Sequence, residues 1–116
     1  MKTVTLLALL SVLAIPAHAD DADAAAGMAA VTDLGQLNGR ALACGDKDAS
    51  AKAKQLMLQH APRTPRYGTA FEQATQQGFL SQVQGQTACP AAPAFAQDIE
   101  QLAAKLRASL PAGAAQ

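Results

Sequence analysis

Few side chains in this 116-residue chain are suited to catalysis. Nucleophilic catalysis needs a nucleophile, a base and an orienting group that converge in space. The pair to consider is Cys44 with His60, but His60 lies in a lysine-rich stretch without a nearby acid, and Cys44 is better used in a disulfide. Asp98 and Glu100 are two residues apart, so they cannot share a helix face as an acid/base pair. We therefore predict no catalytic residues, no cofactor and no enzyme.

One pair of residues has the character of metal ligands. Met57 and His60 stand at positions i and i+3, which share one face of a helix. A thioether beside an imidazole would suit copper. The simpler interpretation, which we favour, makes Met57 a core residue and His60 a half-exposed helix end. We therefore predict no metal site, with Met57 and His60 as the candidate ligands if one exists.

The beginning of the chain has the pattern of a secretory signal peptide. Lys2 supplies a short positive region, residues 4–15 form an apolar run, and residues 17–19 read AHA, a small-x-small cleavage site. The apolar run has about a dozen residues, fewer than the roughly 20 that a membrane helix needs. We therefore expect removal of residues 1–19, a periplasmic or secreted location, and no membrane span.

The two cysteines are expected to bond to each other. In an oxidising compartment an even number of cysteines favours a disulfide, and two cysteines allow one pairing. Cys44 and Cys89 lie in no CxxC motif, which argues against a redox or metal role. A bond between them would close a loop of 46 residues, counting both cysteines, worth about 4 kcal/mol in the chain-entropy model. Such a bond suits a chain with four aromatic residues and a thin core.

The spacing of apolar residues predicts an all-α fold, a small bundle of about four helices stapled by Cys44–Cys89. The acidic, alanine-rich residues 20–27 are expected to form a flexible tail, residues 28–111 a single helical domain, and residues 112–116 a disordered C-terminus. Because the connections are short, neighbouring helices should pack antiparallel. The same topology brings the end of the first helix to the start of the fourth, which agrees with the disulfide.

The four helices are expected near residues 28–44, 49–60, 65–84 and 93–110, with prolines and glycines at their ends. The fourth has the clearest amphipathic pattern. The residues expected to face inward are Val31, Leu34, Leu37, Leu42 and Cys44 on the first helix, Ala49, Ala53, Leu56, Met57 and His60 on the second, Tyr67, Ala70, Phe71, Ala74, Gly78, Phe79 and Val83 on the third, and Phe95, Ile99, Leu102, Leu106 and Leu110 on the fourth.

Two glycines inside the first helix need a reason. Gly35 and Gly39 lie four residues apart on one face, and each weakens a helix by about 1 kcal/mol relative to alanine. A close crossing with a neighbouring helix would compensate for that loss. The Asn38-Gly39 dipeptide also allows a hairpin turn, but its flanks lack alternating β-branched residues, so we favour the helix.

The charges are balanced overall but clustered locally. Nine basic and nine acidic residues leave no net field that would draw the chain to nucleic acid. No acid lies between Asp48 and Glu72, a stretch that contains four basic residues and a tyrosine at the corner of the second and third helices. An ordinary solvated face would explain them, and so would a docking patch for an acidic partner. The candidate partner-binding residues are Lys52, Lys54, Arg63, Arg66 and Tyr67.

These features favour a small non-enzymatic helical interaction module, such as an adaptor, inhibitor or accessory subunit, whose partner is an envelope or secreted protein with an acidic surface. In size, helicity and two widely spaced cysteines the chain is similar to the acid-stress chaperones of enteric periplasm, which implies a chaperone as the alternative. Few carboxylates and one histidine outside the signal argue against an acid trigger. A small-ligand or metal carrier is the third possibility.

Overall fold

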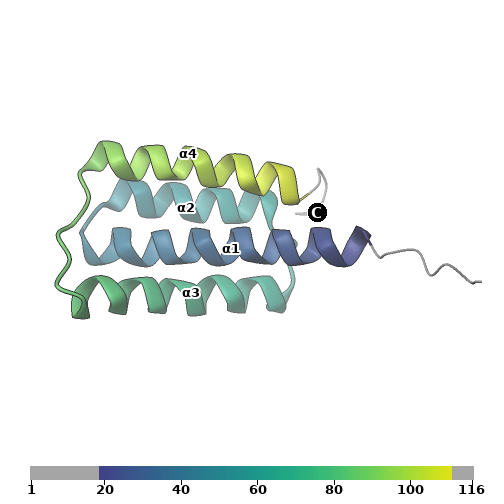
Figure 1. Cartoon of the computed structure of the whole chain (residues 1–116), viewed down its shortest axis with the longest axis horizontal. Helices are drawn as coiled ribbons and strands as arrows, with labels where there is room; N and C mark the ends of the chain where they lie inside the picture. Colours follow the sequence, from purple (N-terminus) through teal and green to yellow (C-terminus); the bar gives the residue numbers. More distant parts are fainter. Residues whose placement is uncertain (1–18, 111–116) are drawn as a thin grey trace, which may run out of the picture.

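The computed structural model describes residues 19–110, which form four helices and no strand (Figure 1). The helices are α1 (Ala19–Ala43), α2 (Lys47–His60), α3 (Pro65–Gln84) and α4 (Ala92–Ser109). The prediction of a small all-α bundle is confirmed. The predicted signal peptide, apart from Ala19, and the predicted disordered residues 112–116 lie outside the described residues.

Local signals set the helix ends. Asp46 caps α2, because its Oδ1 accepts a hydrogen bond from the backbone N–H of Ala49 at 3.0 Å. Pro65 opens α3, as the sequence predicts. Residues 20–27, expected as a flexible tail, are helical in the structure, since alanine has the highest helix propensity. That extension continues the packing of α1: a Cβ on Gly27 would lie 2.6 Å from Leu110 Cδ2.

The core lies between α1, α2 and α4. α1 runs through the middle of the molecule, with α2 and α4 on one side and α3 on the other (Figure 1). All five residues of the predicted α4 stripe are buried, which confirms that prediction. The buried apolar core consists of Ala30, Val31, Leu34, Leu37, Ala41, Ala49, Ala53, Leu56, Ala61, Phe95, Ile99, Leu102, Ala103, Leu106 and Leu110.

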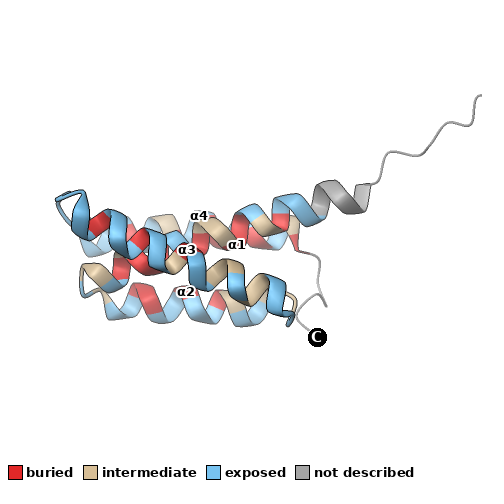
Figure 2. Cartoon of the chain, turned by 90° about the horizontal axis from the view of Figure 1, so that it is seen from below, coloured by how far each residue is buried: buried red, intermediate tan, exposed pale blue. Residues whose placement is uncertain are grey.

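α3 does not pack against its neighbours in the sequence, α2 and α4. It runs parallel to α1, and no Cα atom of α3 comes within 8 Å of α2 or α4. Antiparallel contact between sequence neighbours was therefore the wrong expectation for the α2–α3 and α3–α4 pairs. Three residues expected to face inward are exposed for this reason: Leu42 is 45% exposed, Phe79 41% and Val83 55%. Figure 2 shows the long exposed stretches on α3.

The disulfide joins Cys44, directly after α1, to Cys89, shortly before α4, with a Cα–Cα distance of 5.7 Å. This confirms the predicted pairing. The loop that carries Cys89 is held from α3 as well, because the Gln82 side-chain amide donates to the Thr87 carbonyl at 2.6 Å. The disulfide therefore ties one end of α1 to the connection between α3 and α4.

Candidate functional site

α3 crosses α1 through small residues. A Cβ added to Gly35 would lie 2.6 Å from the Ala74 Cβ, and one added to Gly78 would lie 2.2 Å from the Gln36 carbonyl oxygen. At Gly39 an added Cβ would lie 2.0 Å from the Thr75 carbonyl oxygen. The close crossing expected from Gly35 and Gly39 is confirmed. Because small residues occupy the crossing, Phe79 and Val83 stay exposed, whereas Tyr67 and Phe71 are partly buried against the core.

A chain of hydrogen bonds connects three helices beside this crossing. The Ser50 hydroxyl of α2 donates to Asn38 Oδ1 at 2.7 Å, and Asn38 Nδ2 donates to Thr75 Oγ1 of α3 at 3.1 Å. Thr75 in turn donates to the Phe71 carbonyl at 2.9 Å. Asn38 is 1% exposed. Asn38 therefore connects α2 to α3, and its hydrogen bonds remove the cost of burying an amide.

The hydrogen bonds also show which way the surrounding side chains point. Leu42 follows Asn38 by four residues, and Phe79 follows Thr75 by four, so each lies one turn further along the face that carries the polar residue. On α2, Lys54 and Leu58 continue the row that begins at Ser50. All these rows open into the space between α2 and α3. We call this space, with α1 as its floor, the α2–α3 groove.

On the α2 side of the α2–α3 groove, α2 and Leu42 of α1 line a hollow of about 500 Å³, to which α3 contributes no residue. Leu58 is 65% exposed, the most exposed large apolar side chain in the described part of the chain. The residues that line this space are Leu42, Lys47, Ser50, Ala51, Lys54, Gln55 and Leu58. Leu58 was not assigned to any site from the sequence. Its position off the buried stripe of α2 was the signal that could have identified it.

The structure does not gather the five predicted partner-binding residues into one patch. Lys52 and Lys54 are two residues apart on α2 and lie in different grooves, Lys52 facing α4 and Lys54 facing the α3 side. Arg63 and Arg66 are exposed at the corner between α2 and α3, at the far end of α2. Tyr67 is half-buried and packs against the core. Arg63 and Arg66 thus form the exposed part of the predicted patch at the corner.

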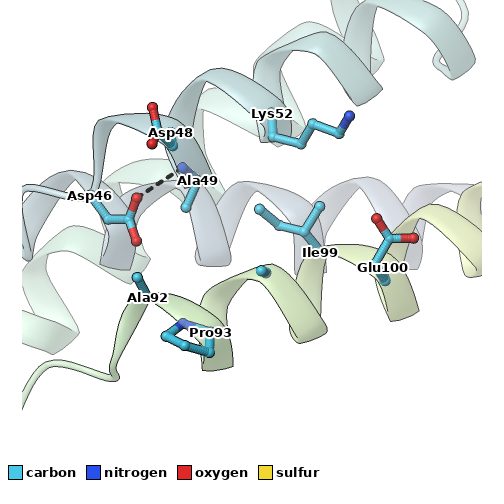
Figure 3. Close-up of a pocket in the computed structure, with 9 residues that line it drawn as sticks. Asp46, Asp48, Ala49, Lys52, Ala92, Pro93, Ile99 and Glu100 are labelled. Atoms are coloured by element: carbon cyan, nitrogen blue, oxygen red, sulfur yellow. Dashed lines mark hydrogen bonds between the residues drawn. The ribbon is translucent and has the colours of Figure 1, made fainter.

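A second hollow lies between the first turns of α2 and α4, with a volume of about 480 Å³ (Figure 3). Its floor is apolar, and Asp46, Asp48 and Glu100 surround it together with Lys52. The Asp46 carboxylate caps α2, so one of the three carboxylates already has a structural role. The two sides of α2 therefore differ in charge: carboxylates predominate towards α4, and lysines towards α3.

The described residues contain no cluster of the kind that holds a metal ion. Within residues 19–110 no group of three or more His, Cys, Asp or Glu residues is placed to hold a metal ion. Met57 and His60 are both half-buried, and Met57 packs against the core. Over the same range none of the helices has the length and apolar character to cross a bilayer.

Comparison of the chain with protein-family models, with curated proteins and with solved structures gives no match. Function is therefore inferred from the geometry of the chain itself.

Proposed function

We propose that this protein is a small non-enzymatic interaction module of the periplasm or of the secreted fraction. It binds another envelope or secreted protein as an adaptor, inhibitor or accessory subunit. One observation carries the proposal: α3 packs against α1 alone and leaves Phe79 and Val83 exposed one turn apart. Apolar side chains grouped on one surface favour association, because covering them gains about 25 cal/mol per Å².

The binding surface is preorganised. α3 is held by the glycine crossing, by the hydrogen bonds of Asn38 and, through its following loop, by the disulfide at Cys89. A surface that is already rigid loses little conformational entropy when a partner binds. This explains how a helix with a single packing neighbour can serve as a recognition element.

Capture of the partner tests the proposal. The purified mature chain would be immobilised, the retained envelope protein identified, and the complex rebuilt from the two purified proteins. Phe79→Ser combined with Val83→Ser should abolish binding and leave the circular dichroism spectrum unchanged, because both side chains are largely exposed. Gln73→Ser with Gln77→Ser, at exposed positions on the other side of the same helix, is the matched control. A partner that binds the Phe79 and Val83 variant normally would refute the proposal.

The exposed arginines support an acidic partner surface. Arg63 and Arg66 lie next to Pro65 at a corner fixed by the start of α3, and the guanidinium fork pairs well with carboxylates. Reversal of both to glutamate should weaken binding and reduce its salt dependence, because exposed charges act mainly on association rate and specificity. The melting temperature should stay nearly constant, since such surface changes shift stability by less than about 0.5 kcal/mol.

A periplasmic stress chaperone is the second candidate, because exposed apolar residues on α3 would also hold unfolded clients. The two functions differ in specificity. A chaperone should bind an apolar dye more strongly after acidification and should prevent aggregation of unrelated proteins. An interaction module should bind one partner at a fixed stoichiometry and show neither behaviour.

A further inference from the structure

Along α2, the lining of the α2–α3 groove is long enough for three turns of a bound helix. Lys47 and Leu58 mark its two ends on α2 and are eleven residues apart, which corresponds to roughly 16 Å of helix or three turns. Leu42 lies towards the Lys47 end, as does Phe79, whose backbone is beside Gly39 of α1, and Leu58 lies towards the other end. Apolar side chains at such intervals match the positions i, i+3, i+4 and i+7 of a docked amphipathic helix.

The charges of the groove select the partner. Lys47 and Lys54 are both exposed, and no acidic residue lies among those that line the groove next to α2. On the facing helix, α3, the single acid is Glu72. Carboxylates on the flanks of a bound helix would pair with the two lysines, whereas a basic helix would meet like charges.

We propose that the α2–α3 groove binds an amphipathic helix with an acidic polar face, supplied by the partner protein. Leucine-like side chains of that helix lie on Leu42, Leu58 and Phe79, and its carboxylates face Lys47 and Lys54. This inference rests on the proposed function and names the chemical class of the partner. It also gives a role to Leu58, which the core does not use.

Binding of two synthetic peptides to the mature protein tests this inference. The acidic peptide has leucines at helical spacing and glutamates on its flanks, and the basic peptide has lysine in place of each glutamate. Both have about 14 residues, enough for the three turns that the groove offers. Fluorescence anisotropy measures their affinity. The acidic peptide should bind, and the basic one should bind at least about tenfold more weakly, because it places like charges together.

Charge-matched variants locate the site. Lys47→Glu with Lys54→Glu should weaken binding of the acidic peptide about tenfold or more. The control, Lys52→Glu with Arg107→Glu, changes the net charge equally at exposed positions outside the groove and should leave the affinity within about twofold. All four side chains are exposed, so the fold should persist, and circular dichroism checks this.

Two leucine variants distinguish binding in the groove from non-specific binding to any exposed apolar side chain. Leu58→Ser should weaken peptide binding, whereas Leu80→Ser should not. Leu80 is 50% exposed but lies about 200° around α3 from Gly78, which faces α1, so it points away from the groove. Equal loss in both leucine variants, or in both charge variants, would overturn the inference.

Other occupants give distinct results. Equal binding of the basic and acidic peptides would mean apolar adhesion without charge selection and would overturn the inference. A dimer in sedimentation that Leu58→Ser converts to a monomer would show that a second copy fills the groove, and would also overturn it. If the acidic peptide does not bind while partner capture still depends on Phe79 and Val83, the inference fails and the proposed function stands. If the peptide binds as expected but the captured partner is insensitive to Phe79 and Val83, the proposed function fails.

Discussion

Alanine at position 39 should destabilise the protein, although alanine is the better helix former. The new Cβ would lie 2.0 Å from the Thr75 carbonyl oxygen and 2.5 Å from the Phe79 nitrogen. Both are backbone atoms, so no side-chain rotation can relieve the overlap. To restore an ordinary contact of at least 3.4 Å, α3 would have to move away from α1 by more than an ångström.

The size of the effect follows from two opposing contributions. Replacing glycine with alanine inside a helix gains about 1 kcal/mol. Forcing an extra carbon into a close contact costs about 1–3 kcal/mol, and displacement of α3 also weakens the Asn38–Thr75 hydrogen bond, worth about 1 kcal/mol. Gly39→Ala should therefore lower the free energy of unfolding by about 1–3 kcal/mol. For a domain of this size, each kcal/mol lowers the melting temperature by roughly 4–8 °C.

Gly68→Ala provides the matched control. Gly68 lies in α3, and a Cβ added there would meet no atom within 4 Å. It should gain up to about 1 kcal/mol from helix propensity alone. Urea unfolding followed by circular dichroism at 222 nm measures both variants. If Gly39→Ala proved as stable as Gly68→Ala, α3 would not cross α1 at the distance described, and the geometry of the α2–α3 groove would be wrong.

Three further substitutions test the apolar core, the disulfide and the hydrogen bonds of Asn38. Leu106→Ala should lower the free energy of unfolding by about 2–5 kcal/mol, since Leu106 is fully buried, and a neutral result would place α4 outside the core. The oxidised protein should weigh two hydrogens less than the reduced one, and Cys44→Ala should reduce stability by about 2–4 kcal/mol. Two reactive thiols in protein purified without reductant would contradict the disulfide. Asn38→Ala should cost about 1–3 kcal/mol in chemical unfolding because it leaves Ser50 and Thr75 without their partner, and Ser50→Ala should recover part of that loss in the double variant.

Local patterns in the sequence were sufficient to predict the helices and the disulfide. Proline at position 65 and the apolar spacing that follows predicted α3 with the bounds that the structure shows, residues 65–84. The stripe of α4 identified five buried residues, because a strongly amphipathic helix has one face that must leave water. The cysteine pairing needed no geometry, since two cysteines allow one bond.

Tertiary structure alone decided which helices touch and which apolar residues stay exposed. An apolar stripe indicates that a face is buried but not against what, so Phe79 and Val83 read as core until α3 is seen to pack on α1 through Gly35, Gly39 and Gly78. The sequence could predict a close crossing at Gly35 and Gly39, because the spacing of two glycines on one helix can be read without knowing the helix that packs there. That α3 is the helix that packs there, without contact to α2 or α4, depends on how α2 and α4 fill the other side of α1.

Asn38 shows the same limit for a polar residue. Beside Gly39 it suggested a turn as the alternative to a helix, because local preferences describe a residue without its distant partners. In the fold its amide reaches Ser50 and Thr75, residues 12 and 37 positions away, and these bonds make its burial favourable. Likewise, Lys52 and Lys54 are two positions apart in the sequence but face different grooves, because two steps along a helix turn the side chain by about 200°. The sequence by itself determined the helices and their covalent link, whereas contacts between distant residues determined the groove.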